Sequence, residues 1–345
     1  MRNSKELKRF FSRLALYISP FVLLFAFFMF SYYKFYSNNE IYTDLTRLSM
    51  RMDDQSYYFS FDTLTCDNLY ARYEYADNAK QNDTSTIWIF GDSFTQKGGN
   101  RIYANYIANN LPGKRVCLIK YSPGAPYSPV EQFVQIAHKE KLPPYVVVSL
   151  VERSLIDRML KLDFSENDSL FCLMSDYSRP PIQVKKPTEM AVEYYKKLLG
   201  IDNPVFSTSL TIDAFSYPGE ESKLLFLNED ILIRYSEKEM DLAISKIDTL
   251  FQFAYNRGTK LSFLVCPDKF EMYQDYLVSD SRFLKDKVVT LDYVSKRVKY
   301  NGYINAKRLL QPYVDQEEKD IYYFNDTHWS PKASKIVADT LSSFF

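Results

Sequence analysis

The sequence predicts an α/β protein in which helices are wound onto both faces of a mostly parallel sheet. Short apolar runs, several rich in β-branched residues, alternate along the chain with longer stretches of helical periodicity. These runs are apolar at consecutive positions, which is typical of parallel strands that are buried on both faces. In such a sheet, functional side chains gather at the carboxyl ends of the strands.

The composition is that of a folded protein with a large core. The 345 residues are 46% hydrophobic and 25% charged, enough for one large domain or two small ones. Lys and Arg number 43 and Asp and Glu also number 43, so the formal net charge is zero. Because nucleic-acid binding requires a basic face, we expect no nucleic-acid partner.

Residues 14–33 form an uncharged apolar run of the length needed to cross a bilayer. Residues 1–13 before it carry five basic side chains against one acidic, so the positive-inside rule places the N-terminus in the cytoplasm. A cleaved signal peptide is the alternative, but the run is long for one and no small-x-small site follows. We therefore expect a cytoplasmic tail, an uncleaved signal-anchor helix and an extracytoplasmic or periplasmic remainder.

The remainder divides by composition. Residues 34–85 are polar and rich in Tyr, and we interpret them as a stalk and a segment that wraps onto the domain. Residues 86–345 carry the alternating pattern of the predicted catalytic domain. Proline pairs and short apolar pieces interrupt that pattern at about 160–235, which predicts an insertion.

The expected elements follow from local signals. Ser128-Pro129 and Ser330-Pro331 are helix N-caps with proline at the first helical position, and Gly258 is a helix stop. Strands are expected at 86–90, 115–120, 145–151, 261–265 and 288–291, and helices at 102–111, 129–141, 236–256 and 331–344.

The first expected strand ends at Gly91-Asp92-Ser93. A serine on a tight turn between strand and helix stands clear of the core, where it can act as a nucleophile near backbone N–H groups. The alternative is a simple turn, since all three residue types favour turns.

A serine nucleophile needs a base and an orienting acid, and the chain has only two histidines. His138 lies within an expected helix and is interpreted as an ordinary helix residue. His328 lies just before the last helix, and Asp326 projects to the same side of an extended segment. The alternative for Asp326-Thr327-His328 is a polar loop that caps the helix. Finding both halves in one alternating domain favours a Ser93, His328 and Asp326 triad.

No cofactor is expected. The four cysteines have spacings that match no metal motif, and the chain has no nucleotide-phosphate loop. Cys117 and Cys266 fall in expected strands, where buried free thiols are ordinary, so the redox state of the cysteines stays open.

Two blocks carry a family resemblance. Gly91-Asp92-Ser93-Phe94 and Asp326-Thr327-His328-Trp329 resemble the SGNH (GDSL-type) hydrolase superfamily, and the second block is similar to its alginate O-acetylation branch. Residues 151–155 and 267–273 resemble further stretches of that branch. The resemblance covers residues 86–345 apart from the insertion. It implies a three-layer fold in which a doubly wound, mostly parallel sheet has the flavodoxin-like strand order.

The resemblance also implies further site residues. The oxyanion would be stabilised by the N–H groups of Ser93 and Gly124, with help from Arg153. The family's usual asparagine is replaced here by Glu152-Arg153, and pairing between these two side chains is the alternative role. Lys269 and Tyr273 either line the acceptor site or serve as a loop charge and a packed ring; Trp329 is grouped with them as a substrate-binding residue.

These observations predict a serine enzyme that O-acetylates a cell-envelope or exported polysaccharide. By resemblance, a multi-span membrane O-acyltransferase would supply the acyl group, because acetyl-CoA does not cross the membrane. A carbohydrate or lipid O-acetyl esterase with the same triad is one alternative. A non-catalytic scaffold of a polysaccharide-assembly complex is the other.

Overall fold

The computed structural model describes residues 2–36, 45, 69–72, 86–96, 103–119, 127–169, 196 and 204–345. The chain divides into two compact units, and the N-terminal helix and the sheet domain belong to different units. Residues 97–102 and 120–126, with Gly124, lie outside the described part, as do most of residues 37–85 and 170–203.

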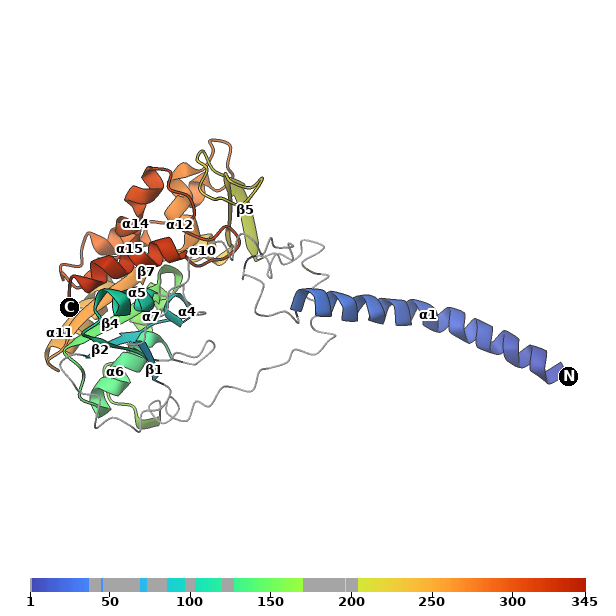
Figure 1. The fold of residues 1–345 in the computed structure, drawn as a ribbon, viewed down its shortest axis with the longest axis horizontal. Helices are drawn as coiled ribbons and strands as arrows, with labels where there is room; N and C mark the ends of the chain where they lie inside the picture. The colour runs from blue at the N-terminus through green and yellow to red at the C-terminus, as the bar shows by residue number, and fades with distance from the viewer. Residues whose placement is uncertain are drawn as a thin grey trace. The chain divides into compact units, whose positions relative to one another are not determined.

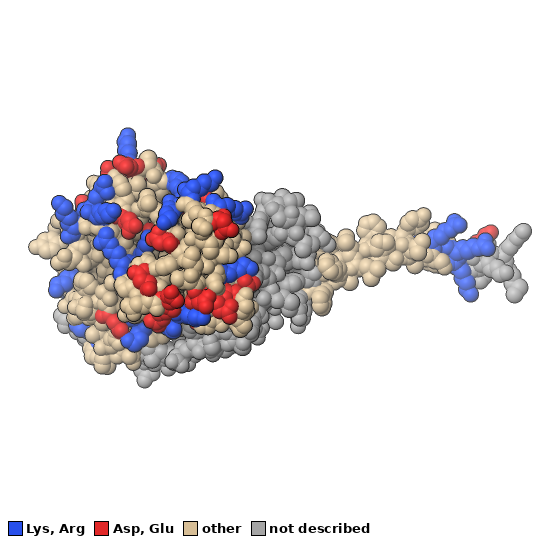
Figure 2. All heavy atoms as spheres, turned by 90° about the horizontal axis from the view of Figure 1, so that it is seen from above, with Lys and Arg blue, Asp and Glu red and all other residues tan. Residues whose placement is uncertain are grey.

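The N-terminal helix α1 (Arg2–Tyr36) is long and continuous through Pro20. Its segment Glu6–Phe30 is long and apolar enough to cross a membrane, and none of it is buried in the protein. Figure 2 shows basic side chains gathered at one end of this helix and an uncharged surface along the rest. Length and composition are therefore those of a membrane-spanning segment.

A six-stranded parallel sheet forms the centre of the other unit (Figure 1). Without the edge strand β1, the remaining strands stand in chain order 2-1-3-4-5, the flavodoxin-like order. The fold class predicted from the sequence is thus confirmed. Across the sheet the strands are β1 (Leu69–Arg72), β3 (Arg115–Ile119), β2 (Thr86–Phe90), β4 (Tyr145–Val151), β7 (Lys260–Cys266) and β8 (Tyr303–Asn305).

The middle strands are buried on both faces, as their sequences require. All five residues of β2 are buried, and six of the seven in β4 and in β7 are buried. Alternate residues such as Phe90 and Val148 enter one large apolar core that also contains Phe133 and Phe251. Burial of such side chains contributes about 1.5–3 kcal/mol each.

Helices cover both faces of the sheet (Figure 1). The two expected caps are formed: Ser128 makes a capping box, and Ser330 accepts a hydrogen bond from the Lys332 N–H. Ser236, which was not predicted as a cap, also makes a capping box. One face carries α5 (Tyr103–Asn110), α14 (Ala306–Asp315) and α15 (Pro331–Ser342), and the other carries α6 (Pro129–Lys139), α7 (Glu152–Lys161) and α11 (Glu237–Tyr255).

The range in which the sequence predicts an insertion, about 160–235, is partly described. The described residues of this range contain an antiparallel pair, β5 (Val205–Ser209) and β6 (Lys223–Leu227), followed by the short helix α10 (Glu229–Leu232). Beyond β7 the chain forms α12 (Lys269–Tyr273), the single turns Gln274–Tyr276 and Leu284–Asp286, and α13 (Thr290–Ser295).

The prediction of a strand at residues 288–291 is wrong. The Val288 N–H donates to the Gln274 side chain and the Val288 carbonyl accepts from it, so a side chain replaces a strand partner. Val289 is 58% exposed, and α13 begins at Thr290. The strand beside β7 is β8 instead, whose three residues are too few to give a sequence pattern.

Cys117 and Cys266 are buried free thiols, whereas Cys66 and Cys172 lie outside the described residues. Burial raises the pKa of the Cys266 thiol well above its usual value. A buried thiol of raised pKa is an apolar core group rather than a reactive one.

Gly302 is required by the pairing of β8 with β7. A Cβ at this position would lie 2.2 Å from the Leu261 carbonyl oxygen. We therefore expect Gly302→Ala to lower the free energy of unfolding by about 1–3 kcal/mol. Gly113→Ala is the matched control, because a Cβ there meets nothing within 4 Å. Denaturant unfolding of both variants measures the difference, and equal stability would contradict this reading of the β7–β8 pairing.

Candidate active site

The turn after β2 is fixed by the Asp92 carboxylate. Its oxygens accept hydrogen bonds from the Phe94 N–H at 3.1 Å and from the Val151 N–H at 2.8 Å. The second bond ties the end of β2 to the end of β4. Burial raises the pKa of Asp92, and these two N–H donors oppose that effect. Ser93 follows directly as the first residue of the short helix α4 (Ser93–Gln96) and is half-buried at the carboxyl edge of the sheet.

Gly91 allows β2 to approach its neighbours closely. A Cβ at Gly91 would lie 1.9 Å from Thr95 Oγ1 and 2.2 Å from Ser149 Oγ. Those two hydroxyls are 2.7 Å apart, and the Tyr103 hydroxyl donates to Ser149 Oγ at 3.1 Å. A buried cluster of hydroxyl groups thus packs against the turn at Gly91, and a side chain at this position would displace those hydroxyl groups.

The other half of the site is the loop of residues 321–330 before α15. The Ser330 N–H donates to the Ile321 carbonyl at 2.9 Å, and the Tyr323 N–H donates to the His328 carbonyl at 3.2 Å. These bonds close the loop at its base. Asp326 and His328 lie at its tip, where the sequence places them two residues apart.

The structure brings Ser93, His328 and Asp326 into one chain of hydrogen bonds. Ser93 Oγ lies 2.8 Å from His328 Nε2, and His328 Nδ1 lies 2.5 Å from Asp326 Oδ1. The same carboxylate oxygen accepts from the His328 N–H at 3.1 Å. Because an ionised carboxylate only accepts, Nδ1 carries the proton beside Asp326, and Nε2 is left to accept from the serine hydroxyl.

Aromatic rings hold the imidazole in place. The Phe94 ring lies 4.7 Å from the His328 ring and 5.0 Å from the Trp329 ring. Trp329 is buried, and its ring centroid also lies 6.3 Å from that of Tyr103. Trp329 therefore packs between α4 and α5 in the interior, which does not fit the expectation that it contacts a substrate.

Lys269 and Tyr273 are also buried, each about 1% exposed. The Lys269 ammonium donates to carbonyls of the 321–330 loop, and the Tyr273 hydroxyl accepts weakly from the Tyr322 N–H at 3.4 Å. Neither side chain lines an open surface, so the expectation of an acceptor site does not fit this burial. Gly124, the other expected oxyanion donor, lies outside the described residues.

Arg153 pairs with aspartates at the ends of other elements. Its guanidinium forms a close ion pair with Asp268 and lies 3.6 Å from Asp230, and its backbone N–H donates to Asp268 at 2.8 Å. Within the described part of the chain it pairs with these groups and not with Glu152, so the Glu152-Arg153 pair is not formed. Burial raises the pKa of Asp268, and the Arg153 charge opposes the rise.

Glu152 belongs to a second buried group of charges. One of its oxygens accepts from the Asp268 N–H at 3.2 Å, and Glu271 lies beside it, held by the Lys307 ammonium at 3.2 Å. Burial, and then the neighbouring charge of Glu271, raise the pKa of Glu152 well above its usual value. Burial likewise raises the pKa of Glu271. Desolvation thus disfavours the ionised form of both carboxyl groups, and the Lys307 charge opposes this effect at Glu271.

His138, the second histidine, has a structural role. Its Nε2 lies 2.9 Å from the Phe164 carbonyl oxygen, and Arg257 Nη2 lies 3.2 Å from its Nδ1. These contacts join α6 to the segments after α7 and α11, which agrees with its interpretation as an ordinary helix residue.

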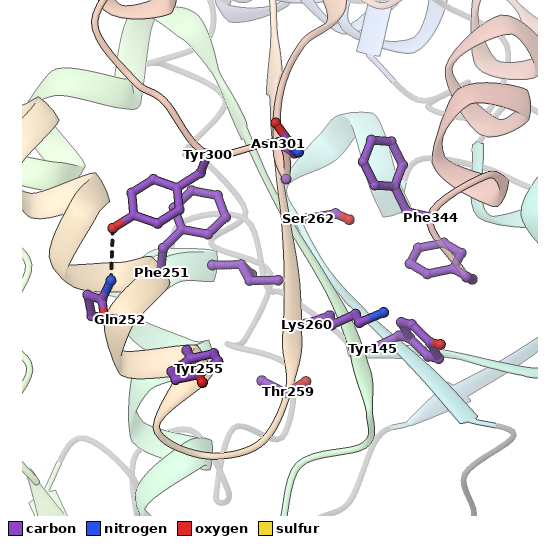
Figure 3. A pocket seen from close by; sticks show the side chains of 13 residues that line it. Tyr145, Phe251, Gln252, Tyr255, Thr259, Lys260, Ser262, Tyr300, Asn301 and Phe344 are labelled. Atoms are coloured by element: carbon purple, nitrogen blue, oxygen red, sulfur yellow. Dashed lines mark hydrogen bonds between the residues drawn. The ribbon is translucent and has the colours of Figure 1, made fainter.

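A pocket of about 540 Å³ lies at the opposite, amino-terminal edge of the sheet (Figure 3). It is lined by the first residues of β4 and β7, Tyr145 and Lys260. Tyr300 stacks on Phe251 with ring centroids 4.4 Å apart and accepts a hydrogen bond from Gln252 at 3.0 Å. Ser93 lies at the carboxyl edge of this parallel sheet, which is the opposite edge, so this pocket is separate from the candidate active site.

Sequence reasoning missed the residues that hold the site together. Asp92 stands within the Gly-Asp-Ser block and Asp268 lies two residues after the end of β7, so both occupy the carboxyl edge where functional groups were expected. Their position was a usable signal. Their partners at the end of β4 and the start of α7, the Val151 N–H for Asp92 and the Arg153 N–H and guanidinium for Asp268, are distant in the sequence and are not encoded in local spacing.

The structure combines a mostly parallel α/β sheet with a serine, a histidine and an aspartate joined at its carboxyl edge. This arrangement agrees with an SGNH hydrolase-like domain, to which part of the chain is similar. Residues 222–345 match a family model described as "SGNH hydrolase-like domain, acetyltransferase AlgX". That part of the chain is therefore similar to AlgX-type domains, and the similarity suggests acyltransferase or esterase activity. The matched range contains Asp326 and His328, whereas Ser93 precedes it. No curated protein matched the chain.

The raised pKa of Glu152 predicts a pH-dependent stability. Above about pH 4.5, its ordinary pKa, Glu152 ionises in the unfolded chain but keeps its proton in the fold, so rising pH favours unfolding. Glu152→Gln removes this effect while keeping an oxygen for the Asp268 N–H. The variant should gain stability relative to wild type as pH rises from 4.5.

Chemical denaturation at a series of pH values measures this gain. Glu229→Gln, at an exposed position, is the control in which no carboxyl group leaves the interior. A stability difference between Glu152→Gln and wild type that stays constant with pH would contradict the account of this buried carboxyl group.

Proposed function

We propose that the chain is an extracytoplasmic serine acyl-transfer enzyme that O-acetylates a cell-envelope or exported polysaccharide. The observation that carries the proposal is the 2.8 Å contact between Ser93 Oγ and His328 Nε2, continued to Asp326 at 2.5 Å. These are the distances over which a base can take the proton of a nucleophile and an acid can orient that base.

The proposed reaction has two stages. Ser93 Oγ attacks the carbonyl carbon of the acyl donor while its proton passes to His328 Nε2; collapse of the tetrahedral intermediate transfers that proton to the leaving group and leaves acyl-Ser93. A sugar hydroxyl then gives its proton to His328 and attacks the acyl carbon, and Ser93 recovers its proton as it departs. Asp326 stays ionised throughout and stabilises the imidazolium.

The tetrahedral intermediate carries a negative oxygen that needs donors. We propose the backbone N–H groups of Ser93 and Gly124 for this role. Since the Arg153 guanidinium is engaged by Asp268, its proposed contribution is positive potential at the site rather than a direct hydrogen bond to the oxyanion.

Two observations support the choice of acetyl as the acyl group and the extracytoplasmic location of the catalytic domain. The family model matched by residues 222–345 is named for an acetyltransferase, which favours acetyl as the group transferred. The apolar helix α1, with its basic N-terminal end, favours a membrane anchor with the catalytic domain outside. A multi-span membrane O-acyltransferase is then the proposed source of the acetyl group, and the polysaccharide is the acceptor.

The proposal is tested by acetyl release from p-nitrophenyl acetate by the full chain in detergent. Ser93→Ala and His328→Ala should each reduce kcat by at least about 1,000-fold, because each removes a member of one catalytic unit. Ser343→Ala, an exposed serine at the end of α15, is the matched control and should keep wild-type activity.

The acceptor is decided by adding a panel of oligosaccharides to the same assay and detecting acetylated sugar by mass. Acetyl transfer to a sugar identifies a transferase, whereas hydrolysis that outruns transfer to every sugar identifies an esterase with the same residues. Activity unchanged in Ser93→Ala and His328→Ala, or absent from the wild-type chain, would overturn the proposal and favour a non-catalytic scaffold.

A further inference from the structure

Lys269 is a buried lysine at the carboxyl edge of the sheet that the reaction above does not use. It is the first residue of α12, three positions after β7 ends, and its side chain is about 1% exposed. Lysine is rarely buried to this extent, because removing an ammonium group from water is costly unless its three N–H donors are satisfied. The partners of this ammonium therefore indicate why it is there.

The Lys269 ammonium donates to the loop that carries the candidate catalytic base. Its Nζ lies 2.6 Å from the Tyr323 carbonyl oxygen, 2.7 Å from that of Phe324 and 3.2 Å from that of Asp326. All three acceptors are main-chain groups within four consecutive residues of the 321–330 loop. One cation thus satisfies the carbonyls of the turn from which the Asp326 and His328 side chains project.

The loop needs such a cation for its shape. Three carbonyl dipoles directed at one buried point repel one another, and each buried carbonyl left without a donor costs about 1–3 kcal/mol. The Lys269 ammonium also lies 4.9 Å from the Phe215 ring, so water is excluded from one side. Without the ammonium the loop would have to turn its carbonyls toward another donor, and Asp326 and His328 would move with it.

We propose that Lys269 is a positioning residue that sets the distance between His328 and Ser93. It is attached to the end of β7, and Ser93 is attached to the end of β2, so the rigid sheet fixes one relative to the other. Lys269 in turn fixes the loop. This role rests on the proposed function of Ser93 and His328, and it replaces the contact with the acceptor sugar that the sequence suggested for Lys269.

The test compares Lys269→Met with Lys307→Met in the full chain. Each variant removes one buried ammonium from the same edge of the sheet, but Lys307 donates to Glu271 and not to the loop. With p-nitrophenyl acetate, Lys269→Met should lower kcat by about 100-fold and leave KM within about twofold, because a misplacement near 1 Å has this cost. Lys307→Met should keep the wild-type kcat. An equal fall in both variants, or a wild-type kcat in Lys269→Met, would overturn the proposal.

A second measurement is independent of turnover. With ¹⁵N-labelled histidine, the chain gives ring signals from two residues only, His138 and His328. In the proton NMR spectrum of the wild type, the proton between His328 Nδ1 and Asp326 should give a far-downfield signal. This signal is assigned by its loss in His328→Ala. Lys269→Met should broaden or shift that signal while the His138 signals stay in place.

The two measurements separate the two claims. If Ser93→Ala retains activity, the proposed function fails, and the His328 signal still decides whether Lys269 orders the loop. An unchanged His328 signal in Lys269→Met overturns the positioning role whatever the activity. Should Lys269→Met fail to fold, Lys269→Gln, which keeps two N–H donors but loses the charge, is read by the same signal and the same kcat.

Discussion

The hydrogen bond between Ser93 and His328 is the contact that the sheet and its turns must hold in place for the site to exist. It joins residues 235 positions apart at a distance of 2.8 Å. A serine hydroxyl on one turn and an imidazole on another can meet only if both turns are held to the same sheet edge. The parallel sheet provides that edge, because its strands all end on the same side. Asp92 then fixes the turn after β2 to β4, and Gly91 lets the chain pass close to Thr95 and Ser149.

Several carboxyl groups are withdrawn from water at the same edge. Glu152, Asp268 and Glu271 are buried there and Asp92 is half-buried, and desolvation raises the pKa of each. Buried charges are tolerated when they are paired and hydrogen-bonded, and removing one partner is more damaging than removing both. Arg153 and Lys307 are the partners in the part of the chain that the structure describes. The contacts of Asp92 and of Asp268 with Arg153 tie the ends of β2, β4 and β7 together at the edge that carries the candidate nucleophile, whereas the Lys307–Glu271 pair joins α14 to α12.

Much of the fold and the centre of the site could be predicted from the sequence. Consecutive apolar residues predicted β2, β4 and β7, and serine-proline caps located α6 and α15. Scarcity singled out His328, since only two histidines exist and one lies inside a helix. Prediction failed where the cause is not local. Val288 and Val289 look like a strand, but Val288 exchanges both of its backbone hydrogen bonds with the Gln274 side chain and Val289 precedes the helix α13. Lys269 looks like a surface charge in its own segment, because the carbonyls that hold it lie more than 50 residues further along the chain. The catalytic roles and the acceptor remain predictions.

The most direct measurement is covalent trapping of the nucleophile. The full chain is treated with a fluorophosphonate, which phosphonylates a serine activated by a neighbouring base, and the modified peptide is identified by mass. We expect one adduct, on Ser93, that is lost in His328→Ala and retained in the control His138→Ala. Labelling of a different serine, no labelling of the folded protein, or labelling of Ser93 that does not depend on His328 would contradict it.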